Sequence, residues 1–186
     1  MNSKTGRAIQ LMLLGALTLT LVGCLSGRVN TVSYASPPQQ PLFVVISPDS
    51  VSLRERMIVG LIEKKMSERA FVKASSPEIA NVTVRYKYSI GPSTTDVSVS
   101  SSPDFVFGGK NVSSSSSTEY PRTFEITVMD NEKSKVSGKV EIIWQGEIYS
   151  SGSSADMTRL APSFIDILFE NYGKTVTNQK FSREIN

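Results

Sequence analysis

The sequence has no histidine and a single cysteine, Cys24, among its 186 residues. One cysteine cannot form an intrachain disulfide, and a chain without histidine cannot build a Cys/His zinc site or a Ser-His or Cys-His catalytic pair. No Gly-x-Ser-x-Gly elbow occurs, and no lysine follows a serine by three positions. We therefore expect a protein that is not an enzyme, with no catalytic residue, no metal and no cofactor.

Acidic residues are absent from the first 23 positions, which carry the two basic residues Lys4 and Arg7. An apolar stretch follows over 8–22, and its fifteen residues are fewer than the roughly 20 that cross a bilayer as a helix. This length is typical of the hydrophobic region of a signal peptide. The sequence thus predicts a signal peptide over 1–23, which is either of the lipoprotein kind or an ordinary one with an incidental cysteine.

The residues Leu21-Val22-Gly23-Cys24 resemble the lipobox of bacterial lipoproteins, in which the cysteine is diacylated before cleavage. This resemblance implies lipid attachment at Cys24 and a membrane location through that anchor. Because Leu25 and Ser26 follow rather than aspartate, it also implies the periplasmic face of the outer membrane in a two-membrane bacterium. Processing would leave 18 basic and 17 acidic residues, a balance that argues against a nucleic-acid partner.

The remaining chain divides into three predicted parts. Residues 24–41 are the lipidated cysteine and a polar, proline-rich segment, which we expect to be a flexible tether. Residues 42–174 carry the periodic apolar patterns of a single domain, and the polar residues 175–186 are expected to be a frayed tail.

Hydrophobic periodicity predicts the elements of that domain. An apolar stripe indicates a helix over 52–66, where Ser52 and Glu55 match a capping box. A second stripe predicts a helix over 160–172, with Pro162 in its first turn and Gly173 just past its end. Residues 130–133 are expected to form a turn. Alternating or continuous apolar residues predict strands over 42–46, 71–74, 82–90, 124–128 and 140–148.

The segment 91–118 is rich in serine and threonine, which fill 14 of the 30 positions from 89 to 118. It is too polar to be core and longer than most loops of compact domains, so we expect a loop with a marginal hairpin. Phe105, Val106 and Phe107 form an apolar island inside it. These residues either pair as a short hairpin at the sheet edge or form a docking tip for a partner.

Together these elements predict an α+β fold, with an antiparallel-rich sheet of about five or six strands and two amphipathic helices on one face. Leu61 and Phe169, one on each helix, are predicted core residues. Trp144 lies on an alternating strand, which favours a core position over a carbohydrate-stacking role.

The order strand, helix, strands, Trp-x-Gly strand, helix resembles the domain-of-unknown-function 4136 family of small bacterial lipoproteins. The resemblance rests on residues 78–84, 143–146 and 162–169 and covers roughly residues 42–173. That family has no assigned activity, so the resemblance implies a fold and a location and adds no site.

The sequence therefore favours a non-enzymatic, lipid-anchored envelope protein that binds an unidentified periplasmic or outer-membrane component. The alternatives are an auxiliary lipoprotein subunit of a lipid or export transporter and, with less support, a cell-wall or glycan hydrolase. An exposed apolar groove would favour the transporter subunit, and a cleft with two facing carboxylates would favour the hydrolase.

Overall fold

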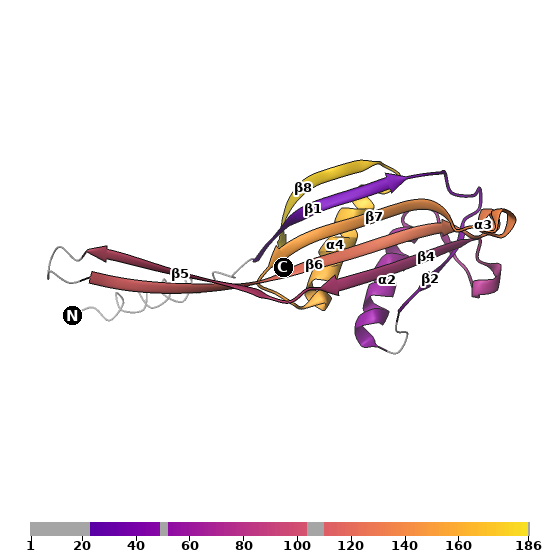
Figure 1. Cartoon of the computed structure of the whole chain (residues 1–186). Coiled ribbons are helices and arrows are strands. Elements are labelled where there is room, and N and C mark those ends of the chain that lie inside the picture. Colours follow the sequence, from indigo (N-terminus) through magenta and orange to yellow (C-terminus); the bar gives the residue numbers. More distant parts are fainter. Residues whose placement is uncertain (1–22, 49–51, 104–109, 186) are drawn as a thin grey trace, which may run out of the picture.

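The computed structural model describes residues 23–48, 52–103 and 110–185. These residues form one mixed sheet and three α-helices, in an α+β arrangement (Figure 1). The elements are β1 (Gly23–Ser33), β2 (Leu42–Ile46), α2 (Leu53–Ser67), β3 (Val72–Lys73), η1 (Pro77–Ile79, a 3-10 turn), β4 (Val82–Ile90), β5 (Thr94–Pro103), β6 (Lys110–Asp130), α3 (Asn131–Ser137), β7 (Glu141–Gly152), α4 (Met157–Glu170) and β8 (Val176–Ile185).

The sheet has eight strands in the order β3-β2-β4-β6-β7-β1-β8, and β5 pairs with β6 beside this path. Strand β2 pairs parallel with β3 and β4, and the other neighbours are antiparallel. The α+β class is confirmed, whereas the sheet is mixed and has more strands than the five or six expected. Parallel neighbours need a crossover connection, which α2 provides, and an apolar pattern does not encode strand direction.

Helices α2 and α4 pack against each other and cover one face of the sheet (Figure 1). The alternation predicted for 82–90 and 124–128 is confirmed, since Val82, Val84, Phe124, Ile126 and Val128 are all fully buried. Trp144 and Phe169 also lie in this core, as predicted. The larger buried side chains are Trp144, Phe43, Phe124, Phe164, Phe169, Leu25, Ile58, Ile62, Met66, Ile126, Ile143 and Ile148.

The buried face of α2 matches part of the expected apolar stripe, which comprises Leu53, Met57, Ile58, Leu61, Ile62 and Met66. Ile58, Ile62 and Met66 are fully buried, whereas Leu61 is only partly buried against the core and Leu53 is 78% exposed. The apolar stripe was wide enough to fit more than one rotation of the helix, and the packing against α4 decides which side is covered.

The predicted start of the last helix and the predicted turn at 130–133 are wrong. Helix α4 begins at Met157, because Asp156 caps it by accepting a hydrogen bond from the Thr158 amide at 2.9 Å. Pro162 therefore lies inside the helix rather than in its first turn. Residues 131–137 form α3 rather than a simple turn, with Asp130 accepting from the Lys133 amide at 2.9 Å.

Residues 24–33 are not a tether and residues 176–185 are not a frayed tail, because they form β1 and β8. Strand β1 lies between β7 and β8 and pairs antiparallel with both. Leu25 and Val29 are each 1% exposed, and Gly27 lies against the ring of Phe181 where a side chain would collide. The glycine interrupts the apolar alternation in the sequence although it completes the packing in the fold.

The predicted loop 91–118 is mostly strand. Its residues form β5 and the first half of β6, which pair as a two-stranded ribbon that projects from one end of the molecule (Figure 1). We call residues 94–103 and 110–119 the arm, and the rest of the described chain the body. Within the described residues, no helix has the length and apolar character needed to span a membrane.

Candidate functional site

The predicted lipid-attachment residue, Cys24, lies near the start of β1. Its thiol is exposed and shares a hydrogen bond with the Ser182 hydroxyl, at 3.0 Å between Sγ and Oγ. Strand β1 begins, β8 ends and the arm leaves the body at the same end of the molecule (Figure 1). Any group attached to Cys24 would therefore lie beside the base of the arm, with no spacer between it and the sheet.

The arm is held by a ladder of ten antiparallel pairs, from Thr94 with Glu119 to Pro103 with Lys110. At about 3.3 Å per residue, this ladder is about 33 Å long. On one face, serine hydroxyls pair across the strands at 2.7 Å, Ser98 with Ser115 and Ser100 with Ser113. The other face carries Val97 and Val99, which are each 66% exposed. The arm thus has one hydroxyl face and one face with exposed apolar side chains.

Both long edges of the arm are unpaired within the described chain. Strand β5 pairs with β6 alone, and β6 joins β7 only from Tyr120 onward. No charged residue occurs over 97–102 or 111–118. Proteins usually protect exposed edges with charges, prolines or bulges, and an isolated hairpin is marginally stable in water. The arm is therefore suited to accept a further strand.

The other predicted contact residues, Phe105, Val106 and Phe107, lie outside the described residues. They belong to the segment that connects Pro103 with Lys110, the outermost described pair of the arm. Their role as a docking tip stays a prediction.

A buried carboxylate joins α2 to β4, and sequence reasoning missed it. Glu55 is 5% exposed, and its Oε1 accepts a hydrogen bond from the Tyr88 hydroxyl at 2.7 Å. Tyr86 donates to Oε2, and the Ser47 hydroxyl lies 3.0 Å from that of Tyr86. Burial and the bond to Glu55 raise the pKa of both tyrosines. Ser52 forms no side-chain cap, so the expected capping box is wrong.

We interpret this cluster as structural, because its hydrogen bonds link α2 to β4. Each Glu55 carboxylate oxygen accepts a hydrogen bond from a tyrosine hydroxyl, so the buried carboxylate is satisfied by hydrogen bonds. The alternation of β4 placed both tyrosines on the inner face, but no local pattern shows that a carboxylate in the first turn of a helix reaches them.

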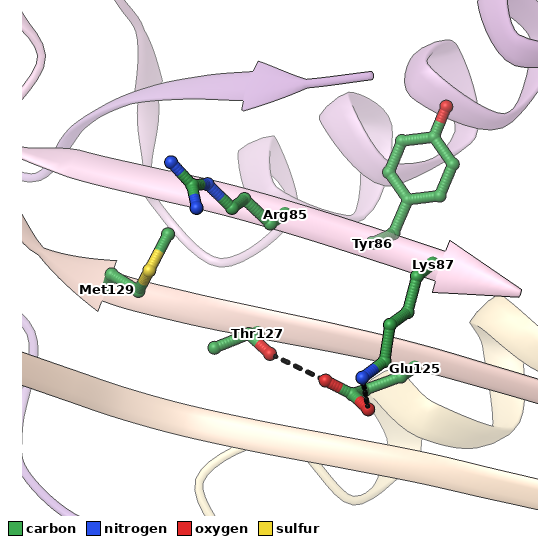
Figure 2. Close-up of a pocket in the computed structure, with 6 residues that line it drawn as sticks. All are labelled: Arg85, Tyr86, Lys87, Glu125, Thr127 and Met129. Carbon is green, nitrogen blue, oxygen red and sulfur yellow. Dashed lines mark hydrogen bonds and ion pairs between the residues drawn. The ribbon is translucent and has the colours of Figure 1, made fainter. Parts of the chain in front are cut away.

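The face of the sheet away from the helices carries a shallow hollow of about 350 Å³, shown in Figure 2. The Lys87 ammonium lies 2.9 Å from Glu125 Oε2, and the Thr127 hydroxyl donates to Oε1 at 3.2 Å. Bonding to Glu125 raises the pKa of Lys87. Figure 2 shows the Tyr86 ring pointing away from this pair, toward the helices.

The hollow does not match the carboxylate pair of a glycosidase. Among the described residues that line it, Glu125 supplies the one carboxylate, and that carboxylate is already paired with Lys87. Over 23–48, 52–103 and 110–185, no cluster of three or more histidine, cysteine, aspartate or glutamate residues has the geometry to hold a metal ion.

Comparison with known proteins gives a fold and no family. No family model and no curated protein matches the chain. A PDZ domain protein from Parabacteroides distasonis is similar in structure, with a TM-score of 0.57 and 11% identity over 95% of this chain. The chain spans 42% of that protein. A PelC dodecamer variant from Paraburkholderia phytofirmans has a TM-score of 0.41 and 10% identity, over 75% of this chain and 94% of that one. The first likeness concerns the fold alone, and the second is too low to bear on it.

Proposed function

We propose that this protein is a lipid-anchored, non-enzymatic protein of the cell envelope, attached through Cys24 to the periplasmic face of the outer membrane. Its function is to bind another envelope component. The lipobox-like sequence at 21–24, the resemblance to the domain-of-unknown-function 4136 family and the exposed Cys24 thiol support this proposal.

The common position of Cys24 and the arm at one end of the body carries the functional part of the proposal (Figure 1). Acyl chains on Cys24 would hold this end against the membrane, since two or more chains give stable anchoring. Because β1 begins beside Cys24, no spacer holds the arm away from lipid. The partner is therefore an envelope component that the arm meets at or near the membrane.

Strand addition is the mode of binding that fits the arm. Its free edges offer backbone amides and carbonyls in regular spacing, and such edges bind extended segments through main-chain hydrogen bonds. Val97 and Val99 give one face apolar side chains that a partner could cover. The ladder then becomes internal to a larger sheet.

The anchor is tested by labelling cells with a radioactive fatty acid. The variant Cys24→Ala is expected to fold, to take up no label and not to mature normally, because it lacks the cysteine that is diacylated before cleavage. Ser26→Ala is the matched control, because Ser26 is an exposed residue on the same strand and should label normally. Labelling of Cys24→Ala equal to that of the parent would overturn the anchor.

Partner binding is tested with a photo-crosslinking residue placed at Val97 in intact cells. Val136 on α3 is the control, because it is 90% exposed and lies at the opposite end of the body (Figure 1). We expect a discrete crosslinked product from position 97 and none of the same size from position 136. The same product from both positions, or none from position 97, would contradict binding through the arm.

A further inference from the structure

A small pocket of about 80 Å³ lies next to Cys24. It is formed where β1 begins, β7 ends and the chain turns into α4. Two of its lining residues are arginines, and none of the described lining residues is acidic. The lining is Cys24, Leu25, Arg122, Gly152, Ser153, Ser154 and Arg159.

Arg122 lines this pocket as a buried cation without an anionic partner. It is 4% exposed, and no carboxylate of the described chain lies within ion-pair distance of it. Its Nη1 donates to the Ser154 carbonyl at 3.1 Å, while Nε has no hydrogen-bond partner among the described residues. A side chain at Gly152 would collide with Nη2, so this glycine leaves the space that the guanidinium occupies.

The Glu119 carboxylate, which acts on Arg122 electrostatically, does not form an ion pair with it. Burial lowers the pKa of Arg122, and the Glu119 carboxylate partly opposes this change. Glu119 is engaged elsewhere, because its Oε2 accepts from the Ser151 hydroxyl at 2.6 Å. An arginine stays protonated in proteins, so the site holds a buried, incompletely bonded positive charge. Such a charge is costly unless an anion completes it.

Arg159 adds a second guanidinium from a different element. It lies in the first turn of α4, is exposed, and has no hydrogen-bond or ion-pair partner among the described residues. The two arginines line the same pocket, Arg122 from β6 and Arg159 from α4, and each guanidinium carries several N–H donors. This arrangement suits an anion with several oxygens, because the guanidinium fork matches phosphate geometry.

We infer that the pocket formed by Arg122 and Arg159 beside Cys24 binds a phosphate group, in a phospholipid headgroup or as free phosphate. The headgroup source rests on the proposed function, since an anchor at Cys24 places the pocket at the membrane surface. The pocket would then fix how the body sits on the lipid, in addition to the attachment by the acyl chains.

The test uses the protein purified from membranes in detergent, as the cell processes it. Its melting temperature is measured against inorganic phosphate, short-chain phosphatidylglycerol and, as a phosphate-free control, short-chain diacylglycerol. A ligand that binds the folded state raises the melting temperature in a concentration-dependent way, which gives Kd. We expect a rise with a phosphate probe and none with diacylglycerol. Phosphatidylglycerol binding more tightly identifies the headgroup, and equal or tighter binding of inorganic phosphate identifies the free ion.

Variants assign the effect to the pocket. Arg159→Gln changes an exposed residue and should weaken the tighter-binding phosphate probe about tenfold, the effect of losing one charge-assisted hydrogen bond. Arg122→Gln should weaken binding at least as much, provided that its far-UV circular dichroism matches the parent. Lys135→Gln removes the same charge from exposed α3 at the opposite end and should bind like the parent.

Two results would contradict phosphate binding by the pocket. One is the absence of any rise with both phosphate probes, and the other is parental binding by Arg159→Gln. Fatty-acid analysis of the same preparation separates this inference from the proposed function. An Arg159-dependent rise in protein that carries no lipid would support the pocket and contradict the anchor. No rise in lipidated protein would contradict the pocket alone.

Discussion

Strand β6 passes through both the arm and the body, and its two halves differ in what surrounds them. In the body, Phe124, Ile126 and Val128 are fully buried under the helices, and the residues between them are half-exposed. In the arm, residues 113–117 are five exposed serines. Both halves have antiparallel ladders, with one register shift in the body between Val128 and Met129. Backbone pairing between strands therefore does not require apolar side chains. The stability of the folded body does require them, because it comes from their burial.

This difference assigns separate tasks to the two regions. Burial of apolar side chains gives the body its stability, since each fully buried large side chain contributes roughly 1.5–3 kcal/mol. The arm has backbone bonds and hydroxyl pairs, whose net contribution of about 1 kcal/mol each is offset by the entropy of ordering the chain. Regions of low local stability are the ones that bind and rearrange. The body is the scaffold, and the arm is the binding element of the proposed function.

The largest expected effect is in the body, where Phe169→Ala should lower the free energy of unfolding by about 3–5 kcal/mol. Phe169 packs against Trp144 and Tyr172, and the Arg69 guanidinium lies 5.0 Å from its ring centre. Leu61→Ala should cost less, because Leu61 is only partly buried. Urea denaturation followed by circular dichroism measures both. Equal and small losses for the two variants would contradict the core that we describe.

The next effect is at the buried carboxylate. Glu55→Ala removes the carboxylate that accepts hydrogen bonds from the Tyr86 and Tyr88 hydroxyls, which should cost about 1–3 kcal/mol. The double variant that also carries Tyr88→Phe removes one of these hydroxyls and should recover part of the loss. A double-mutant cycle in urea measures the coupling. Additive losses from Glu55→Ala and Tyr88→Phe would show that the two groups do not interact.

A smaller effect is expected at high pH. Burial raises the pKa of Tyr172 to about 12, with Arg69 opposing the shift, and the Tyr172 hydroxyl has no hydrogen-bond partner among the described residues. The raised pKa means that the folded state keeps its proton while the unfolded state loses it above about pH 10. Stability from this group is thus complete below pH 10 and is lost as the pH rises toward 12.

Tyr172→Phe should therefore unfold like the parent at neutral pH and lose less stability between pH 10 and pH 12. Urea titrations across that range give the comparison, and the parent serves as the control for the other tyrosines whose pKa is raised. Parallel losses in the two proteins would show that Tyr172 ionises equally well in both states.

The smallest expected effect on stability comes from removing the arm. Replacing residues 94–119 with Asn-Gly joins β4 to the body half of β6 through a short connection that contains a turn-forming dipeptide. Because the arm residues 94–100 and 113–117 are exposed, the free energy of unfolding should change by less than about 1 kcal/mol. A large drop in stability would make the arm part of the fold instead of a binding element.

The sequence predicted the parts of the fold that have a simple local pattern. Strand β4 and the body half of β6 alternate cleanly, and α4 carries a strong apolar stripe. Strand β1 was missed because Gly27 and the buried Thr31 replace apolar residues in its inward positions. The arm was missed because serine is typical of loops, and its ladder depends on the pairing of two polar segments.

The candidate sites also differ in how far the sequence alone could predict them. Cys24 was found because four consecutive residues carry the motif. The Glu55 cluster and the Arg122 pocket join residues that lie far apart in the chain, and Arg122 comes from a strand that otherwise reads as alternating. No spacing in the sequence brings Arg122 and Arg159 together with Cys24. The order of strands in the sheet and the position of α4 bring them to one pocket.

The central claim is that the end of the body carrying Cys24 and the arm faces the membrane. Since Cys24 is the one native cysteine and would be blocked by lipid, Val97→Cys and Val136→Cys each allow a spin label at a single position. With the lipidated protein in vesicles, electron paramagnetic resonance compares collisions with lipid-soluble oxygen and with a water-soluble nickel complex. We expect the ratio of oxygen to nickel collisions to be clearly higher at position 97 than at position 136. An equal ratio, or a higher one at position 136, would contradict the orientation and the function built on it.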